Sequence, residues 1–507
     1  MREEIKMEYK HTPKTKTALI AAIREEIKLQ GERANLNCID TSAITNMREL
    51  FTKFRSFNGD ISGWDVSNVT DMSDMFYRSS FRGDISGWNV DKVEYFLPMF
   101  KWCRIPQEHR PVRFRMKRDA NAPDLNGKVR FWDDTVASFS LTGDGVLTVS
   151  GDLSCDRHSS LYSDLDGDIP VRKLIIAEGV TTIGERMFSE WRNLEEVTFP
   201  ESLTEIKDSA FERCRNIARL NFPKRGLLKI GGSAFPSCPV RELHLPETLT
   251  YIGPYAFEGF KELEELVIPD SVESVGKWRV FKDCSSLKSV KLPAHLKVIT
   301  DSMFAGCAKL RSVTIPEGVM ELDSTFYQCA SLKEISIPRS VIKIGHNTFS
   351  ACTKLEKIDV AEDNPVYKSV DNCCLTKDGR TLVFGCSSSV IPEGVKVIED
   401  FAFYMCPGLK NVTIPEGVEY IGNWSFGDCR ELESVNIPRS VKEIVLCAFS
   451  GTSIKDIFIA LDDPDKCPDL EEPFRGLRLN RMTVHVPEEA FYKYSRHPFF
   501  KRFLRIV

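Results

Sequence analysis

The feature that most constrains this fold is a pattern that occurs three times between Phe281 and Cys352. The copies read FKDCSSLKSVKLPAHLKVITDSMF, FAGCAKLRSVTIPEGVMELDSTF and FYQCASLKEISIPRSVIKIGHNTF. Each runs from F-x-x-C through L-x-x-V/I-x-I/L-P and an apolar pair back to Phe. A period of about 23 residues predicts a solenoid, because one such unit cannot bury its apolar face without a neighbour.

The same period extends over residues 170–459. In the unit from Leu310 to Cys329, Val313 and Ile315 alternate with polar residues, which predicts a strand with one buried face. Proline ends that strand, V-x-x-I-G predicts a second short extended piece, and A-F or S-F predicts a tight helical turn. The repeat phenylalanines are Phe188, Phe211, Phe235, Phe257, Phe281, Phe304, Phe326, Phe349, Phe403, Phe426 and Phe449. We therefore expect a strand-dominated α/β solenoid in which these side chains stack.

An insert interrupts the period between Phe349 and Phe403. Residues 360–391 predict a hairpin around the turn Lys377-Asp378-Gly379. The insert contains Cys373, Cys374 and Cys386. A metal or redox site is one interpretation of these cysteines. A structural variant of the repeat is favoured, because no nearby His or carboxylate pair completes a ligand set.

A second repeat precedes the main array. The segment SFNGDISGWDVSNVTDMSDMF returns as SFRGDISGWNVDKVEYFLPMF, which sets Trp64 and Trp88 one period apart. Its aspartates, Asp60, Asp65, Asp71 and Asp74, raise the alternative of a calcium site. Asp beside Gly and Ser is more often a turn or cap residue, so we expect that structural role.

The ends of the chain predict caps for the array. Near the start, Leu19, Ile20, Ile23 and Ile27 fall on one helical face, with Thr17 as cap and Gly31 at the end. This helix either covers an open end of the array or binds a partner. At the other end, Val484 and Val486 predict a last strand. The aromatic and apolar residues expected to cover it are Phe491, Tyr494, Phe499, Phe500, Phe503 and Ile506.

Six regions follow from these patterns. They are a tail and capping helix (1–34), the second repeat (35–103), a basic connector and linker (104–135), a hairpin cap (136–169), the main array (170–459) and a C-terminal cap (460–507). We expect the basic run of the connector to be solvated, because no base-stacking motif accompanies it. Asp164, Asp166 and Asp168 imitate an EF-hand loop, but Ile175 occupies its glutamate position.

Cysteine placement predicts buried thiols. Of the 16 cysteines, eight stand three residues after the repeat Phe, and no C-x-x-C occurs. The eight are Cys214, Cys238, Cys284, Cys307, Cys329, Cys352, Cys406 and Cys429. A residue kept at one repeat position stacks on its equivalents, so we expect small buried side chains with reduced thiols rather than disulfides.

Composition and missing motifs exclude several function classes. The net charge is −5, which gives the whole chain no attraction to nucleic acid or anionic membrane. No apolar run is long enough for a transmembrane helix, and no signal peptide or lipobox is seen, which predicts a cytoplasmic location or export by another route. G-x-S-x-G, H-E-x-x-H, Walker and dinucleotide motifs are absent from the sequence. We expect no catalytic, cofactor or metal residues and no enzyme activity.

The outward strand positions form two columns of polar residues, which we expect to be the partner-binding face. Because these side chains are held on a stiff sheet, little ordering is needed on binding. The candidate residues are Glu196, Thr198, Arg219, Asn221, Glu242, His244, Glu265, Lys291, Thr314, Glu334, Lys357, Asp359, Asn411, Thr413 and Asn436. His244 lies between Leu243 and Leu245 without an adjacent nucleophile, so it is interpreted as a surface residue.

Both repeats resemble a known family. GDISGWDVSNVTDMSDMF resembles the repeat of bacterial surface lipoproteins of the BspA type and their mycoplasmal relatives, and IPEGVEYIGNWSF resembles the BspA-like leucine-rich repeat. The resemblance implies a curved, right-handed solenoid with a parallel sheet. It also implies protein or matrix binding and adhesion without catalysis, often at the cell surface or outside the cell.

Two functions from different classes follow. The first is a protein-interaction or adhesion module whose partner is a host-matrix or bacterial protein. The alternative is an intracellular structural scaffold. A hydrolase in the insert is a third and weaker hypothesis, because no constellation of catalytic groups supports it.

Overall fold

The computed structural model describes residues 9–115, 124–131, 135–155 and 171–507. These residues form two compact units, Met1–Leu227 and Leu228–Val507. We call them the N-terminal unit and the C-terminal unit. The EF-hand-like triplet Asp164, Asp166 and Asp168 lies outside the described residues, as do the first part of the tail and part of the linker. The six regions expected from the sequence stay a prediction.

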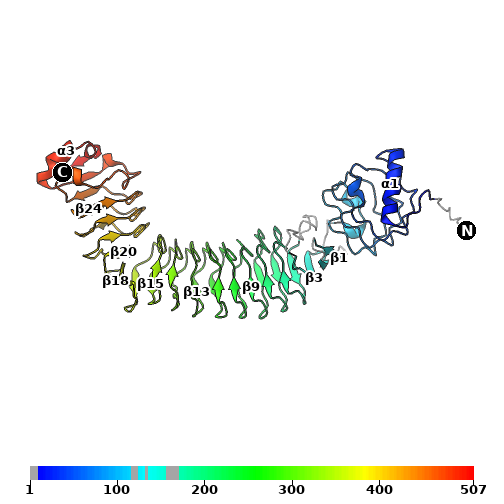
Figure 1. Cartoon of the computed structure of the whole chain (residues 1–507), viewed down its shortest axis with the longest axis horizontal. Coiled ribbons are helices and arrows are strands. Elements are labelled where there is room, and N and C mark those ends of the chain that lie inside the picture. The colour runs from blue at the N-terminus through cyan, green and yellow to red at the C-terminus, as the bar shows by residue number, and fades with distance from the viewer. Residues whose placement is uncertain (1–8, 116–123, 132–134, 156–170) are drawn as a thin grey trace. The chain divides into compact units, whose positions relative to one another are not determined.

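Helix α1 (Lys16–Gln30) opens the N-terminal unit (Figure 1). Thr15 caps it by accepting a hydrogen bond from the Ala18 amide, so the predicted cap at Thr17 is wrong. Thr17 lies within the first turn, whereas Thr15 has the extended backbone that an N-cap needs. Gly31 ends the helix, as predicted, with a left-handed φ of 79°.

The buried face of α1 carries an acid. The helix buries Leu19, Ala22, Ile23 and Glu26, so the predicted apolar stripe is only partly right. The Glu26 carboxylate accepts hydrogen bonds from Lys10 at 2.5 Å and Gln30 at 2.5 Å, and bonds His11 at 2.8 Å. These bonds, first of all that from Lys10, lower the pKa of Glu26 to about 2.

The stability of the N-terminal unit should therefore depend on acid pH. The folded-state pKa of Glu26 lies below its ordinary value of 4.5, so its contribution is complete above that value. The contribution is lost as the pH falls from about 4.5 to about 2. We expect Glu26→Gln to lower the unfolding free energy at pH 6 and to differ little from the parent near pH 2. Denaturant unfolding measures this, with the exposed Glu25→Gln as control. If the difference in unfolding free energy between the parent and Glu26→Gln stays the same as the pH falls, the role given to the Glu26 carboxylate is contradicted.

Stacked aromatic rings fill the second repeat. Phe51 and Phe76 stack at 5.3 Å, Phe76 and Phe100 at 6.1 Å, and Trp64 and Trp88 at 6.4 Å between ring centroids. The only helical element in its described coils is the 3-10 turn η1 (Leu50–Lys53).

The aspartates of this repeat organise turns. Asp60 accepts a hydrogen bond from the Ser62 amide at 2.9 Å, and Asp65 accepts one from the Ser67 amide at 3.0 Å. Asp71 accepts from both the amide and the hydroxyl of Ser73. For these three residues the predicted turn role is therefore confirmed.

Two arginines of the described part of the connector are not solvated, which corrects the prediction for them. Arg110 is buried, lies over the Phe100 ring at 4.4 Å and donates to the Ile105 carbonyl at 3.2 Å. Arg113 donates to the backbone carbonyls of Val90 and Asn126. Backbone carbonyls thus hold two of the arginines, that of Ile105 within the connector and that of Val90 in the second repeat. The connector also contains two 3-10 turns, η2 (Gln107–His109) and η3 (Val112–Phe114).

Part of the predicted linker is a strand. β1 (Leu125–Arg130) pairs antiparallel with β2 (Val136–Leu141), which pairs with β3 (Val146–Gly151) as the predicted hairpin. Gly127 permits this strand, because a Cβ there would lie 2.5 Å from the Phe96 ring and 2.9 Å from the Phe139 ring.

Parallel strands of the first coils follow in the same unit. β3 pairs with β4, β4 with β6, and β6 with β8, while β5 pairs with β7. Their bounds are β4 (Lys173–Ile176), β5 (Thr182–Ile183), β6 (Glu196–Thr198), β7 (Glu205–Ile206) and β8 (Arg219–Asn221).

The C-terminal unit is a stack of coils, most of which present two extended segments (Figure 1). The outward segments are β11 (Glu265–Val267), β13 (Ser289–Lys291), β15 (Glu334–Ile337), β17 (Lys357–Val360), β22 (Asn411–Val412), β24 (Ser434–Ile437), β26 (Asp456–Ile459), β27 (Thr483–His485) and β28 (Arg505–Ile506). The short segments are β9 (Lys229–Ile230), β10 (Tyr251–Ile252), β12 (Ser274–Val275), β14 (Glu321–Leu322), β16 (Lys343–Ile344), β21 (Val397–Ile398), β23 (Tyr420–Ile421) and β25 (Glu443–Ile444). Pairing between successive coils is parallel, as predicted.

The repeat phenylalanines stack one above another. Ring centroids are 6.0 Å apart between Phe281 and Phe304, 6.1 Å between Phe304 and Phe326, and 5.7 Å between Phe326 and Phe349, with near-parallel planes. All four side chains are buried. The predicted stacked solenoid is confirmed.

The segment around each repeat Phe is a turn and not the predicted helical turn. No helix occurs within residues 171–459, all of which the structure describes. Ser302 has a left-handed φ of 56° and Gly306 one of 76°, which breaks a helical hydrogen-bond pattern. The amides of Phe304 and Gly306 instead donate to the next coil, to Thr325 at 3.0 Å and Tyr327 at 2.7 Å. The turns therefore form a further ladder between coils.

The repeat cysteines form a ladder of thiol donors. All 16 cysteines are free thiols, and of the eight repeat cysteines only Cys406 is not fully buried. The thiol of Cys329 donates to the Phe304 carbonyl, and that of Cys352 to the Phe326 carbonyl, both at 3.3 Å. Burial raises the pKa of Cys352 to about 12. The sequence predicted burial but not this hydrogen bond.

We expect these thiols to resist alkylation while the protein is folded. The thiolate is the reactive form, and burial disfavours it. Iodoacetamide at pH 8 should leave Cys307, Cys329 and Cys352 unmodified and should label them fully in denaturant, as read by peptide mass spectrometry. Glutathione in the same tube controls for reagent activity. Fast native labelling of these three residues would contradict the buried ladder.

The insert consists of three antiparallel strands. β19 (Cys373–Thr376) pairs with β18 (Tyr367–Val370) and with β20 (Thr381–Phe384). The predicted turn at Lys377-Asp378-Gly379 joins β19 to β20. The sequence analysis missed the first hairpin, whose turn is Asp371-Asn372 with φ values of 50° and 57°. Asp-Asn between extended residues is the signal that indicates it.

The C-terminal cap contains an additional strand. Val484 lies in β27 as predicted, but the chain end returns as β28, which pairs parallel to β27. Helix α3 (Phe491–Arg496) lies between them in sequence, and it leaves Phe491 exposed, which corrects that part of the prediction. Tyr494, Phe500 and Phe503 are buried as expected. The cap also includes the 3-10 turns η4 (Pro464–Lys466), η5 (Leu479–Arg481), η6 (Glu488–Ala490) and η7 (Phe500–Arg502).

Candidate functional site

The predicted outward columns lie at the surface of both units. Twelve of the fifteen candidate residues are exposed, and Glu196, Thr198 and Asn436 are half-buried. Within the C-terminal unit the strand register aligns Glu334 with Lys357. It aligns Asn411 with Ser434 in the same way. Whether these residues bind a partner stays a prediction.

In the N-terminal unit the candidate residues bind one another. Glu196 lies 3.0 Å from the Lys173 ammonium and 3.6 Å from the Arg219 guanidinium. Asn221 donates to Glu196 at 3.0 Å. A partner would have to replace these contacts, so this part of the face is less available.

Sequence reasoning missed an aromatic residue on the face. In β26 the register places Asp456 opposite Ser434 and Phe458 opposite Asn436. Phe458 is 45% exposed and stacks on the His485 ring at 4.3 Å, and His485 bonds Asp456 at 2.8 Å. The strand IKDIFI follows the same alternation as its predecessors, and that signal would have extended both columns.

A groove opens the face in the first coils of the C-terminal unit. Residues 241–245 form no strand, although their pattern matches the strands on either side. The groove has a volume of about 830 Å³. It is lined by Arg241, Glu242, Leu243, His244, Leu245, Glu247, Glu264, Glu265, Val267, Ile268, Pro269, Asp270, Ser271 and Lys291. Four of the predicted residues, Glu242, His244, Glu265 and Lys291, therefore meet at one site.

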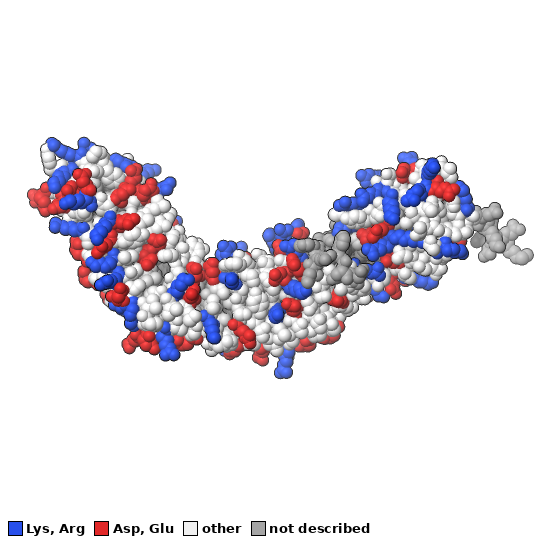
Figure 2. All heavy atoms as spheres, viewed as in Figure 1, with Lys and Arg blue, Asp and Glu red and all other residues white. Residues whose placement is uncertain are grey.

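The groove is acidic around an apolar floor. Its lining has five carboxylates against two fixed cations, Arg241 and Lys291. Glu264 is neutralised by Arg241 at 3.6 Å and by Lys288 at 2.5 Å. Val267, 56% exposed, supplies apolar surface. Elsewhere on the face visible in Figure 2, acidic and basic side chains of the C-terminal unit are interspersed.

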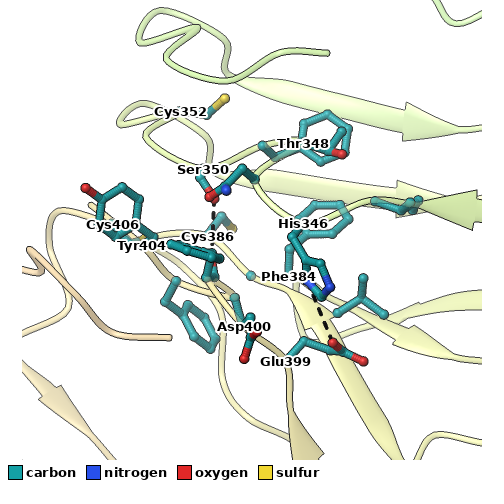
Figure 3. A pocket seen from close by; sticks show the side chains of 18 of the residues that line it. His346, Thr348, Ser350, Cys352, Phe384, Cys386, Glu399, Asp400, Tyr404 and Cys406 are labelled. Atoms are coloured by element: carbon teal, nitrogen blue, oxygen red, sulfur yellow. Dashed lines mark hydrogen bonds and ion pairs between the residues drawn. The ribbon is translucent and has the colours of Figure 1, made fainter. Parts of the chain in front are cut away.

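A separate cavity of about 270 Å³ lies where the insert joins the stack (Figure 3). Its walls come from the coils of residues 344–352 and 399–406 and from β20. At the mouth His346 faces Glu399, with Nδ1 3.9 Å from the carboxylate. The Ser350 hydroxyl donates to the Phe401 carbonyl at 3.4 Å.

The cysteines of the insert serve its packing. Cys373 and Cys374 are fully buried, and Cys386 is 2% exposed. Burial raises the pKa of Cys373 to about 12. In the part of the chain that the structure describes, no group of His, Cys, Asp and Glu has an arrangement that would hold a metal ion. Nor does any helix of that part have the length and apolar character to cross a bilayer.

Two family models match the chain. The model described as BspA type Leucine rich repeat region matches in six copies over residues 167–279, 278–377 and 383–465. The model described as Mycoplasma protein of unknown function, DUF285, matches residues 21–109, where the second repeat lies. No curated protein matches the chain.

Solved structures of bacterial leucine-rich repeat proteins are similar to the chain. A protein from Bacteroides ovatus ATCC 8483 has 25% identity over 71% of this chain and 100% of that chain, with a TM-score of 0.45. A leucine rich cell surface protein from Faecalibacterium prausnitzii A2-165 has 23% identity over 73% and 92%, with a TM-score of 0.44. The leucine-rich repeat protein of T. pallidum has 23% identity over 43% and 87%, with a TM-score of 0.31.

The family assignment follows from the repeat pattern and from the matching model together. The Phe and Cys ladders show that the repeats form one kind of coil. Because the BspA-type model also matches more than half of the 507 residues, this chain belongs to the BspA type leucine-rich repeat family.

Proposed function

We propose that the chain is a non-catalytic protein-interaction module, acting in adhesion, that holds a protein partner on the outward face of its C-terminal unit. The observation that carries the proposal is the acidic groove, where four of the outward residues converge beside exposed Val267. A rigid strand scaffold supports binding, because its side chains are already ordered before the partner arrives.

The charge of the groove favours a basic partner segment. Five carboxylates against two fixed cations give an attraction for lysine and arginine side chains. The open, elongated form of a sheet face suits an extended segment whose alternate side chains enter the groove. A basic stretch of a matrix protein or of a bacterial protein would fit equally well.

The chemistry of the thiols supports a non-catalytic role. Proteins of this family and fold are typically non-catalytic. A cysteine nucleophile has to be exposed and has to ionise near neutral pH. Cys373 of the insert is instead fully buried, with its pKa raised to about 12 by burial. The hydrolase hypothesis for the insert has no support from this arrangement.

Binding of basic peptides tests the proposal. Fluorescence anisotropy should show a lysine-rich extended peptide binding the chain, with affinity falling as salt rises. The triple variant Glu242→Gln, Glu247→Gln, Glu265→Gln should bind about tenfold more weakly, because each neutralised carboxylate removes roughly 0.5 kcal/mol. The control triple Glu393→Gln, Glu431→Gln, Glu443→Gln removes equal charge elsewhere and should bind as the parent does. An equal loss of peptide affinity in both triple variants would show that only the net charge matters. It would contradict binding at the groove.

Location separates adhesion from the intracellular scaffold. An adhesion protein has to be reachable from outside the cell. Intact source cells treated with a membrane-impermeant amine label should therefore yield labelled chain, with a cytoplasmic enzyme as the negative control. Labelling only after lysis would favour the scaffold.

A further inference from the structure

The insert breaks the hydrogen-bond ladder between coils. In the regular stack the Phe326 amide donates to Thr348 at 3.1 Å, and the Phe403 amide donates to Ser425 at 2.7 Å. The equivalent acceptor for the Phe349 amide would be the Ala402 carbonyl, which instead accepts from Gly385 at 2.9 Å. Phe349 thus has no backbone acceptor among the described residues.

The two coils nevertheless remain joined at one side. The Ala351 amide donates to the Tyr404 carbonyl at 3.2 Å. The Phe384 ring takes the next place in the aromatic stack, 4.6 Å from Phe349. The two coils are therefore joined at Ala351 but not at Phe349. The cavity next to β20 lies between them (Figure 3). Its volume of 270 Å³ is far above the roughly 10 to 15 Å³ that a single water molecule needs, so a small organic group fits.

The polar groups of the cavity are mainly acceptors. Glu399 and Asp400 supply two carboxylates, and none of the lining residues is a lysine or an arginine. Asp400 Oδ1 already accepts from the Asn423 amide at 2.7 Å and Glu399 lies 3.9 Å from His346, so the second oxygen of each carboxylate is the acceptor for a ligand. The Asn347 Oδ1 atom is buried and has no hydrogen-bond partner in the described structure. A buried acceptor without a donor costs free energy, so a ligand that donates would be stabilised there.

Aromatic rings supply the rest of the wall. Phe349, Phe384 and Phe403 line the cavity and are buried, while Phe401 and Tyr404 are half-buried and contact each other edge to face at 5.6 Å. Rings of this kind attract cations through their faces and apolar groups through their area.

We infer that this cavity binds an organic ammonium group on a short apolar stem. An ammonium has three donors and no acceptor, which matches two carboxylates and an unpartnered amide oxygen. Its stem would lie against the phenylalanines. None of the lining residues belongs to the outward columns, so the site goes beyond the proposed function. The ammonium comes from a free amine or from a lysine side chain of a protein, because both present the same chemistry.

A comparison of matched probes tests the inference on the parent chain. Ligand-observed NMR titration should show phenethylammonium binding at least tenfold more tightly than the neutral isostere 2-phenylethanol, because only the cation pairs with the carboxylates. N-acetyl-lysine methylamide and its Nε-acetylated form repeat the comparison for a chain-embedded lysine. Binding of phenethylammonium alone assigns the site to free amines, and binding of the lysine probe extends it to proteins.

Variants locate the binding in the cavity. Glu399→Gln with Asp400→Asn should weaken phenethylammonium at least tenfold, whereas Glu443→Gln, two coils away, should leave it unchanged. Asn347→Gly removes the unpartnered oxygen but tolerates the φ of 63° at this position, and it should also weaken binding. Thermal unfolding establishes that each variant folds. Equal binding of amine and alcohol, no binding of either cation, or full affinity in the carboxylate variant would overturn the inference.

Discussion

Replacing Phe326 with alanine is expected to destabilise the middle of the C-terminal unit by about 3 to 5 kcal/mol. The ring is fully buried, with Phe304 at 6.1 Å on one side and Phe349 at 5.7 Å on the other. Its removal leaves a cavity between coils that cannot close, because the Phe304 amide bonds Thr325 and the Phe326 amide bonds Thr348, which keeps the three coils at their spacing. Each coil of a repeat protein is stabilised by its neighbours, so the loss should weaken adjacent coils as well.

Hydrogen exchange measured by mass spectrometry reports this local effect better than a single melting temperature. Protection should fall in residues 300–352 and change least near α3. Phe326→Leu keeps most of the buried volume and should cost less than about 1.5 kcal/mol. Phe458→Ala removes the same side chain from the exposed face, where we expect about 0.5 kcal/mol. Equal costs for Phe326→Ala and Phe458→Ala would contradict the stacked core.

Replacing Asn364 with leucine is expected to cost about 3 to 4 kcal/mol, because three buried backbone groups and one part-buried group would each lose a partner worth about 1 kcal/mol. The side-chain amide donates to the carbonyls of Pro338 and Val341, both at 2.9 Å. Its oxygen accepts from the amides of Val366 at 2.9 Å and Tyr367 at 2.8 Å. Asn364 is fully buried, so water does not compensate.

The expected result is an insert detached from the coil before it. Amide exchange should accelerate in β18 and β19, and the unfolding free energy should fall. Asn364→Asp keeps the acceptor but sets a carboxylate against two carbonyls, so it should also be strongly destabilising. Asn411→Leu, at an exposed outward position, should change stability by less than about 1 kcal/mol. If Asn364→Leu lowers the unfolding free energy only slightly and the amides of the insert stay protected from exchange, the hairpins do not depend on this residue.

The candidate face was predictable in part. Alternation along each strand assigned Glu242, Glu265 and Lys291 to the solvent side, since a one-residue shift would bury charge. That these residues line a groove was not predictable. At the groove, residues 241–245 form no strand, although their sequence reads like that of the outward strands.

The charged residues whose environment the sequence did not indicate share a cause. Arg113 reads as solvated from composition, yet it binds the Val90 carbonyl of the second repeat. Glu26 reads as part of a polar helix face, yet Lys10 and His11 enclose it. In each case the deciding partner comes from another segment of the folded chain, and no local pattern indicates which group it will be.

The sequence by itself determined the coil, with its period, its extended pieces and its stacked Phe and Cys residues. Each repeat packs against another copy of the same pattern, so the repeat position of a residue indicates which residues it contacts. The tertiary structure alone decided where that regularity fails. The cavity beside β20 arises where a coil meets the insert and not the next regular coil, and the groove lies where residues 241–245 form no strand although they keep the repeat pattern. The repeat pattern contains no information about either departure.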